Sequence, residues 1–291
     1  MTTKPAAAVQ TRSSKTNFRQ RTAFLRYLVV IVACLLIIFP FYWMVITSLK
    51  QPASIGSWPP KLWGFHVTWS SYAQDFIHYT FGNYIFNSVL VAVVSTILIL
   101  ILGSLAGYAI ARLPIRGKPF LLIATLVISL FPEIAVVSPL YVIFRQLHWL
   151  NSYQALIIPY TAFNLPFAIW IMNNYFLGIP KELEESARMD GASTGTILIK
   201  IILPLAVPGM FTAGIFSFVA AWTEFLMALT FNSQNTMRTI PVGIALFGSQ
   251  FTIPYGNIFS ASVVAVVPII VLVLVFQRWV VSGLTAGAVK G

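Results

Sequence analysis

The stretch IPKELEESARMDGASTGTILIKIILP occupies residues 179–204 and stands between two long apolar runs. Four of the seven acidic residues of the chain fall within nine positions of this stretch: Glu182, Glu184, Glu185 and Asp190. Over the whole chain charge is sparse. Of all residues 58% are hydrophobic and only 9% are charged, whereas soluble domains carry about 25% charged residues. The stretch is therefore interpreted as a water-exposed connection between helices that cross a membrane.

Local signals predict two short helices in this stretch. Pro180 can occupy the first turn of a helix, and the glutamates that follow it complement the helix dipole. Gly191 is expected to end that helix in the left-handed conformation. Ser193 or Thr194 can cap a second helix that leads to Pro204. The expected result is a helix, a tight turn and a second helix on one face of the membrane.

Working outward from this connection, the apolar runs supply six candidate spans of about 20 or more residues. Their approximate limits are 24–49, 85–111, 119–144, 153–177, 205–231 and 258–282. Four prolines inside the third and fourth runs predict kinks there: Pro132, Pro139, Pro159 and Pro166. The sequence thus predicts an all-α integral membrane protein with one transmembrane domain over 24–282, an N-terminal tail over 1–23 and a C-terminal tail over 283–291.

The first apolar run is expected to remain in the protein as a spanning helix. It is longer than the roughly 7–15 residues of a signal-peptide core, and no small-residue cleavage site follows it. Its single cysteine, Cys34, has no partner for a disulfide. Three histidines lie in or beside loops and form no HExxH pattern, so no metal site is predicted: His66, His78 and His148.

The distribution of Lys and Arg predicts the orientation of the spans. Fourteen of the 18 basic residues fall on one side of the six runs, together with both termini and the connection at 179–204. Since basic residues accumulate in cytoplasmic loops, both termini are predicted to be cytoplasmic. The loop at 51–84 would then be external, and its many aromatic residues suit either the membrane interface or contact with a soluble partner.

Three motifs in the chain resemble one known family. The pattern Glu185-Ser-Ala-x-x-Asp190-Gly-Ala192, followed by Ile202-Leu-Pro-Leu205, is similar to the EAA loop of ABC importer permeases, except that serine stands at 186 where the family has alanine. The stretches AWTEFL at 221–226 and GLTAGAVKG at 283–291 resemble the carbohydrate-uptake branch, in particular its maltose-type G subunits. The resemblance covers residues 25–291.

The resemblance implies the type I ABC importer permease fold, with six transmembrane helices and a coupling loop at 179–204. It implies that this loop seats in a cleft on a cytoplasmic ATPase, through residues of the motif: Glu185, Ala187, Asp190, Gly191, Ala192 and Pro204. It also implies that the C-terminal tail, including Thr285 and Lys290, contacts the same ATPase, although a frayed tail is the ordinary state of a terminus. The bacterial cell membrane, inner or plasma, would be the location of the chain.

The expected assembly contains a second permease subunit, two copies of an ATPase subunit and an external solute-binding protein. The sequence has no G-x-x-x-x-G-K-[ST] phosphate loop, so ATP and magnesium are expected to act in the partner ATPase, and this chain is expected to bind no cofactor and to be no enzyme. A carbohydrate or polyol is the expected cargo, and its identity is left open.

Two acidic residues lie within predicted spans, Glu133 and Glu224. A charge at mid-membrane costs about 2.5–3.5 kcal/mol on insertion scales, so each is expected to face the bundle interior or an aqueous cavity. Together with Trp222 and Asn164 they are candidates for lining a translocation path. The alternative is ordinary hydrogen bonding between helices.

Two other functions stay open from the residues alone. A secondary transporter would work without an ATPase and usually shows internal repeats, and no convincing repeat is found here. A membrane-embedded enzyme would need a convergent catalytic constellation, which the few titratable groups do not supply.

Overall fold

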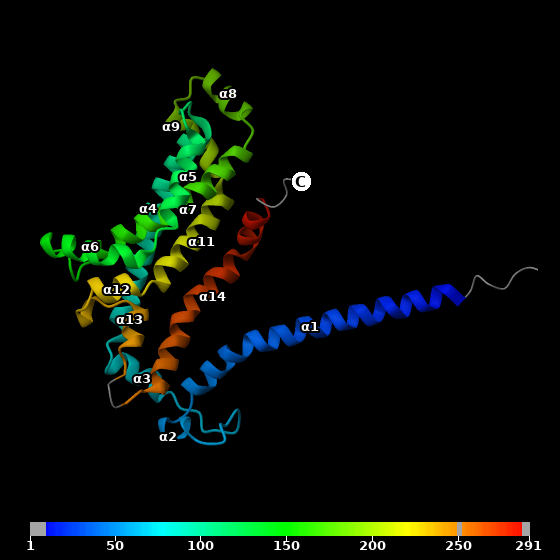
Figure 1. The fold of residues 1–291 in the computed structure, drawn as a ribbon, viewed down its shortest axis with the longest axis vertical. Coiled ribbons are helices and arrows are strands. Elements are labelled where there is room, and N and C mark those ends of the chain that lie inside the picture. The colour runs from blue at the N-terminus through cyan, green and yellow to red at the C-terminus, as the bar shows by residue number, and fades with distance from the viewer. Residues whose placement is uncertain (1–9, 249–251, 287–291) are drawn as a thin grey trace, which may run out of the picture.

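The computed structural model of the chain describes residues 10–248 and 252–286, and these are mostly helical (Figure 1). Side chains are described for residues 25–248 and 252–277. The five longest helices are α1 (Gln10–Ser48), α4 (Phe81–Arg112), α7 (Gln154–Gly178), α11 (Val207–Thr223) and α14 (Tyr255–Ala286). The shorter helices are α2 (Pro52–Ile55), α3 (Ser70–Ile77), α5 (Lys118–Ser129), α6 (Glu133–Gln146), α8 (Glu182–Met189), α9 (Thr194–Ile197), α10 (Leu203–Leu205), α12 (Leu226–Phe231) and α13 (Ile240–Ala245).

Helix α4 is the centre of the bundle and packs most closely against α7. Two glycines four residues apart, Gly103 and Gly107, make this close approach possible. A Cβ atom at Gly103 would lie 3.1 Å from the Cβ of Ala168, and one at Gly107 would lie 2.9 Å from the Cβ of Met172. The absence of side chains at these two positions therefore sets the distance between the two helices.

Four helical segments in the described ranges are long and apolar enough to cross a membrane: Leu25–Ser48, Phe81–Arg112, Gln154–Gly178 and Tyr255–Gln277. Two further candidates are helix pairs with sharp bends. Helices α5 and α6 meet at 83°, and the segment Thr194–Leu205 meets α11 at 78°. The described part of the chain thus offers four spans, or up to six if each bent pair is one span.

The predicted spans at 119–144 and 205–231 are not continuous helices. The first breaks between Ser129 and Glu133, where Pro132 is extended at φ −66° and ψ 121°, because proline lacks an N–H and disfavours helix in the residue before it. The second breaks at Glu224, which has extended backbone angles between α11 and α12. Pro159 and Pro166, by contrast, lie inside the single helix α7.

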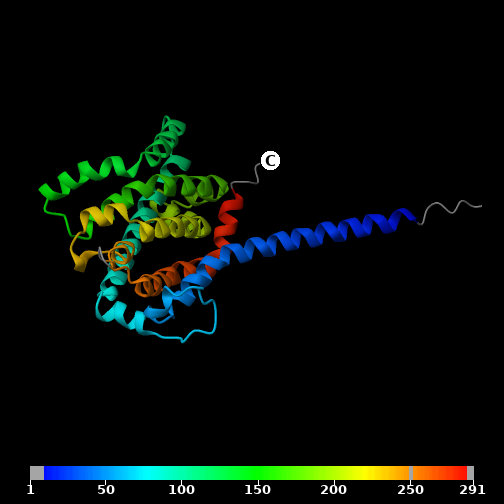
Figure 2. The ribbon, with the colours of Figure 1, turned by 60° about the horizontal axis from the view of Figure 1, so that its bottom comes forward.

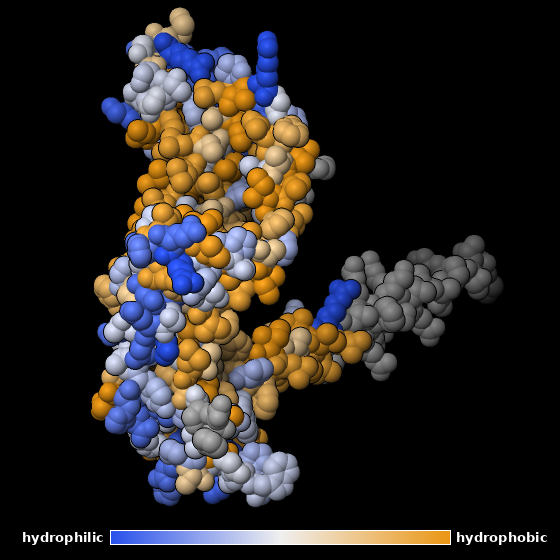
Figure 3. Space-filling view, turned by 60° about the vertical axis from the view of Figure 1, so that its left-hand side comes forward, coloured by the Kyte–Doolittle hydropathy of each residue, from blue (hydrophilic) through white to orange (hydrophobic). Residues whose placement is uncertain are grey.

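Most of α1 projects from the bundle, as two views agree (Figures 1 and 2). The apolar side chains of residues 25–42 are exposed, and burial begins only near Trp43. The C-terminal end of α1 packs against α14. Figure 3 shows hydrophobic side chains over the coloured part of this projecting helix and over much of the upper body, with hydrophilic residues at the upper end and over the middle and lower body. Helix α1 therefore exposes a long apolar surface that the rest of this chain does not cover.

The end of the bundle opposite α8 holds two buried charged residues. Asp75 of α3 is fully buried and accepts hydrogen bonds from Asn257 and Ser260 of α14. Burial raises the pKa of Asp75, and these two hydrogen bonds oppose that effect in part. Lys50 is also buried, which lowers its pKa, and its ammonium lies 4.8 Å from the centre of the Trp43 ring. These contacts fix the segments after α1 to the bundle.

Candidate functional site

Helix α8, the turn after it and α9 form a compact knob, defined here as residues 182–197, at one end of the bundle (Figure 1). The helix begins at Glu182, two residues after Pro180, and three glutamates lie in its first turn. Gly191 has φ +81° directly after the end of α8. Its N–H donates to the carbonyl of Arg188 at 3.0 Å, and the N–H of Ala192 donates to the carbonyl of Ala187 at 2.9 Å. This pair of bonds is the Schellman motif, so the predicted left-handed glycine is confirmed.

The second half of the knob continues towards the membrane helices without a loop. Ser193 is the N-cap of α9, and its hydroxyl accepts a hydrogen bond from the N–H of Thr196 at 3.3 Å. A π-helical segment, Leu198–Ile202, follows α9 and leads into α10, which contains Pro204. The chain turns at Ala206 into α11. The knob is thus joined to α11 by almost continuous helical backbone.

An apolar seat lies beneath the knob. Its buried side chains come from α4, α7, α8 and α9 with the π-helical segment after it, including Tyr108, Phe176, Ala187, Ile197 and Leu198. Ala187 is therefore buried within this chain, and its role in coupling to the ATPase, which the family resemblance implied, stays a prediction. Its methyl group holds α8 against the bundle.

The outward surface of the knob carries charge and two exposed large apolar side chains, Leu183 and Met189. Glu185, Asp190 and Gly191 are exposed, as is Pro204 on α10. Met189 is 89% exposed at the tip of α8. Sequence reasoning did not single out Met189. A long apolar side chain so exposed beside acidic residues is suited to entering a pocket on another protein.

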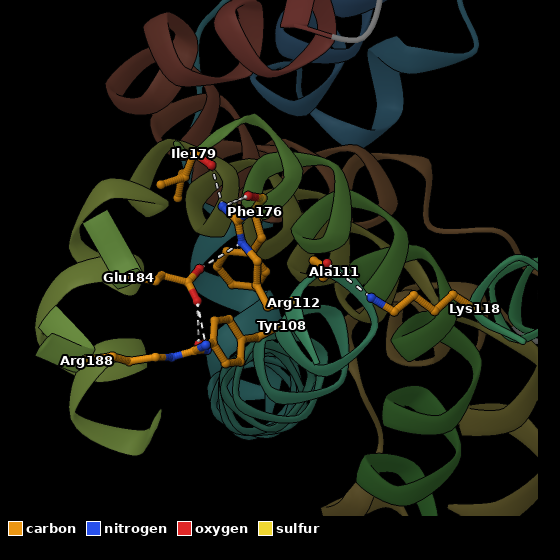
Figure 4. Close-up of polar contacts among 8 residues, drawn as sticks. All are labelled: Tyr108, Ala111, Arg112, Lys118, Phe176, Ile179, Glu184 and Arg188. Carbon is orange, nitrogen blue, oxygen red and sulfur yellow. Dashed lines mark hydrogen bonds and ion pairs between the residues drawn. The ribbon is translucent and has the colours of Figure 1, made fainter. Parts of the chain in front are cut away.

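Glu184 is the exception among the acidic residues of the knob, because its side chain points into the bundle (Figure 4). One carboxylate oxygen lies 2.8 Å from Nε of Arg112, at the end of α4, and the two side chains are 3% and 6% exposed. The hydroxyl of Tyr108 donates to the other oxygen at 3.1 Å. Arg188 also approaches that oxygen at 3.7 Å, with a half-exposed side chain. Sequence reasoning had assigned Glu184 only to the helix dipole.

Arg112 also contacts the end of α7. Its Nη2 donates to the carbonyl of Phe176 at 2.7 Å and to the carbonyl of Ile179. Close by, the Nζ of Lys118 lies 3.4 Å from the carbonyl of Ala111, which is also near the end of α4 (Figure 4). Arg112 and Lys118 thus donate hydrogen bonds to backbone carbonyls at the ends of α4 and α7.

A second polar site lies deeper in the bundle, at the break between α11 and α12. Glu224 accepts hydrogen bonds from the N–H groups of Met227 at 2.7 Å and Ala228 at 3.1 Å, and from the hydroxyl of Tyr160. A pocket of about 40 Å³ adjoins it, lined by Glu133, Tyr160, Phe163, Asn164, Ala220, Glu224 and Met227. The carboxylate thus caps α12, whose first N–H groups have no partner within the helix.

The structure brings three of the four predicted path residues to this pocket, namely Glu133, Glu224 and Asn164. Trp222 lies elsewhere. Its ring is 3% exposed and stacks on Phe218, and its Nε1 donates to the carbonyl of Ala265 on α14 at 3.1 Å. Trp222 therefore ties α11 to α14 and is not positioned to stack on a ligand in this pocket.

Two further predictions concern the C-terminus and metals. Thr285 lies in the last turn of α14, beyond the residues whose side chains are described, and Lys290 lies outside the described residues altogether. Among the residues that the structure describes, no group of three or more His, Cys, Asp or Glu side chains could hold a metal ion.

Comparison with known proteins gives consistent matches. The profile of the family described as "Binding-protein-dependent transport system inner membrane component" matches residues 99–285. The chain is 43% identical, over 87% of its length and 89% of the relative, to the sulfoquinovosyl glycerol transport system permease protein SmoH of Agrobacterium fabrum. It is 41% identical, over 91% of its length and 97% of the relative, to the trehalose/maltose transport system permease protein MalG of Thermococcus litoralis.

A solved structure has a similar fold. It is the crystal structure of a bacterial ABC transporter involved in the import of the acidic polysaccharide alginate, and one of its chains superposes with a TM-score of 0.77. The match covers 89% of this chain and 96% of that chain at 20% sequence identity, so it supports the fold alone.

Proposed function

Because the chain belongs to the family of binding-protein-dependent transport system inner membrane components, it is a permease subunit of an ABC importer, and we propose that its cargo is a carbohydrate or a related polyol. The support for this cargo is the printed function of relatives more than 40% identical over most of the chain, which carry sulfoquinovosyl glycerol or trehalose and maltose. The chain is a transporter subunit and not an enzyme.

The observation that carries the mechanism is the knob. It is a water-exposed, acidic pair of helices on an apolar seat formed largely by the ends of α4 and α7. We propose that a cytoplasmic ATPase receives it, with Glu185, Asp190 and Met189 at the contact and Gly191 forming the bend. Two packed helices move as one body, so movement of the ATPase would rotate the attached spans, as alternating access requires. ATP and magnesium would act in two copies of that partner.

The exposed surface of α1 supports the proposal of a second permease subunit. Among the described side chains, residues 25–42 of α1 are exposed and burial begins near Trp43, so lipid or another membrane chain is expected to cover the exposed part. Contact with a sibling subunit would let the two chains enclose a path between them. An external solute-binding protein would deliver the cargo at the end of the bundle that holds α3 and α13, opposite the knob (Figure 1).

We also propose an orientation of the chain in the membrane. The knob, the N-terminus and the C-terminus would be cytoplasmic, and residues 51–80 external, in agreement with the excess of Lys and Arg on the knob side. Activity of an external reporter enzyme fused after Gly291 would contradict it.

The pocket beside Glu224 is proposed to form part of the path. A volume of about 40 Å³ accommodates two or three water molecules but no sugar ring, since one water needs about 10–15 Å³ on this measure. A carbohydrate would therefore fit only where this wall meets the sibling subunit. Carboxylate, phenol and amide groups there could bind the hydroxyl groups of such a cargo.

Two substitutions of Glu224 distinguish contact with the cargo from capping of α12. Glu224→Gln retains the side-chain shape and one accepting oxygen, but its NH2 group cannot accept a hydrogen bond, so the thermal stability of the complex is expected to lie between those of the wild type and Glu224→Ala. Glu224→Ala removes the cap and is expected to lower stability by about 1–2 kcal/mol. If the carboxylate contacts the cargo, Glu224→Gln is expected to lower uptake per folded complex several-fold. Wild-type uptake by Glu224→Gln would assign Glu224 to capping alone.

Transport by the reconstituted complex tests the proposed function. This chain would be purified with its sibling permease, ATPase and binding protein and placed in liposomes with ATP on the side of the knob. Uptake of labelled trehalose and maltose is expected to require both ATP and the binding protein. Uptake that continues without the ATPase and stops when an ion gradient is collapsed would instead identify a secondary transporter.

A further inference from the structure

The connection between the knob and the membrane helices depends on one buried side chain. Arg112 belongs to α4, its Nη2 donates to two carbonyls at the end of α7, and its Nε lies 2.8 Å from the carboxylate of Glu184 on α8. The guanidinium group of Arg112 on α4 thus contacts both the end of α7 and α8 (Figure 4). Besides this group, the hydroxyl of Tyr108 on α4, short peptide segments and apolar contacts hold α8 in place.

We propose that the Arg112–Glu184 pair is the joint that delivers movement of the knob to α4 and α7. The proposal rests on the proposed function, in which an ATPase moves the knob, and it names the residues that make this movement effective. Arg112 and Glu184 are positioning residues in this scheme, because neither is placed to touch the ATPase or the cargo.

Apolar packing alone would not transmit the movement as well. Contacts such as those of Ala187 with the seat are non-directional, so a rotating helix can slide across them. A buried guanidinium that contacts a carboxylate and two carbonyls fixes both angle and distance, because its planar N–H groups have a rigid geometry. The exposed Arg188 adds a longer contact of 3.7 Å, which solvent weakens.

The α7–α8 connection shows why such a joint matters. Only residues 179–181 separate the two helices, and Ile179 and Pro180 are not helical. Arg112 bonds the carbonyl of Ile179 in this connection and the carboxylate of Glu184 in α8. Without the guanidinium, movement of α8 could be absorbed by this short segment before it reaches α7.

The test compares Glu184→Gln with Glu182→Gln in the reconstituted complex. Both change a glutamate of the first turn of α8 to glutamine, but Glu182 is exposed and its side chain forms no hydrogen bond or ion pair with the described residues. For Glu184→Gln, the ATPase is expected to remain bound, since the exposed surface of the knob is intact. Cargo moved per ATP hydrolysed is expected to fall about tenfold, because the buried ion pair is lost while the side-chain shape is kept. Glu182→Gln is expected to match the wild type.

A double variant separates the joint from mere stability. Glu184→Gln combined with Arg112→Gln leaves no unpaired buried charge, so thermal stability is expected to rise above that of Glu184→Gln alone, while staying below the wild type because the carbonyls of Phe176 and Ile179 lose their donor. The ratio of cargo to ATP is expected to stay low, because the charge pair is still missing. Recovery of the ratio together with stability would overturn the proposal, as would a single Glu184→Gln variant whose ratio equals that of the wild type.

A distance measurement that does not depend on transport tests the joint even if the proposed function is wrong. Spin labels at Glu182→Cys and Arg116→Cys, in a Cys34→Ser background, report the distance between α8 and the segment after α4. Glu184→Gln is expected to broaden the distance distribution in the assembled complex. An unchanged distribution would overturn the joint, whereas absence of ATP-dependent uptake by the wild type would overturn the proposed function alone.

Discussion

A permease that carries Gly107→Leu is expected not to accumulate as a folded subunit. A Cβ atom at this position would lie 2.9 Å from the Cβ of Met172 and 3.0 Å from the backbone nitrogen of Asn173. Neither atom belongs to a flexible side-chain end, so α4 and α7 would have to separate. Overpacking costs about 1–3 kcal/mol for small additions, and Gly107→Ala alone is expected to fall in that range. Leucine adds three more carbons at the closest helix contact of the bundle.

Two alanine substitutions provide matched controls for this prediction. A Cβ atom at Gly214 would meet first a methyl group of Leu100 at 3.3 Å, which can move, and one at Gly178 would have no atom within 4 Å. Both variants are expected to be folded and close to the wild type in thermal unfolding of the purified complex. If Gly107→Ala were as stable as Gly178→Ala, the close packing of α4 on α7 would not limit the size of the side chain at position 107.

Gly191→Val is expected to abolish transport and its coupling to ATP hydrolysis while leaving membrane insertion intact. Gly191 has φ +81° and open space around it, so the effect comes from the backbone and not from a clash. A residue with a Cβ costs about 1–2 kcal/mol in the left-handed region, and β-branching adds to this. Such an energy lowers the population of the native turn about 5- to 30-fold. The knob would then present Met189 and Asp190 in the wrong direction.

The control for Gly191→Val is the same change four residues later. Gly195 has an ordinary helical φ and no atom within 4 Å of a Cβ, so Gly195→Val is expected to transport normally. Gly191→Asn should retain much of the activity, because asparagine tolerates the left-handed region better than other residues. Substrate uptake and ATPase activity of the three complexes decide the matter, and unchanged uptake by Gly191→Val would refute the assigned role of the turn.

The sequence predicted best what short-range chemistry determines. The all-α membrane class and the permease family are confirmed, and the turn at Gly191 with the cap at Ser193 has the expected geometry. These features depend on neighbouring residues: a glycine after a helix, a serine before one and an apolar run between polar segments. The position of each is therefore visible without knowledge of the tertiary structure.

What the sequence did not reveal depends on contacts between distant segments. Nothing local distinguishes Glu184, which is buried, from Glu185 one position later, which is exposed. Their difference arises because Arg112, 72 residues earlier, lies under one face of α8. The kink predicted at Pro132 is a bend of 83° between α5 and α6, whereas the break at Glu224 was hidden, since an apolar run with no proline at that point looks the same whether its helix is straight or bent. The glycine spacing at 103 and 107 was one signal that could have been used.

The projecting α1 has a consequence for how such a subunit is made. In water, an apolar surface of this extent would cause aggregation. Within a bilayer it is no liability, because lipid chains are as apolar as the side chains that they cover. A newly inserted subunit can therefore persist alone and diffuse laterally until a complementary chain meets it. Shape and polar contacts, and not the avoidance of water, would then decide which chain it accepts.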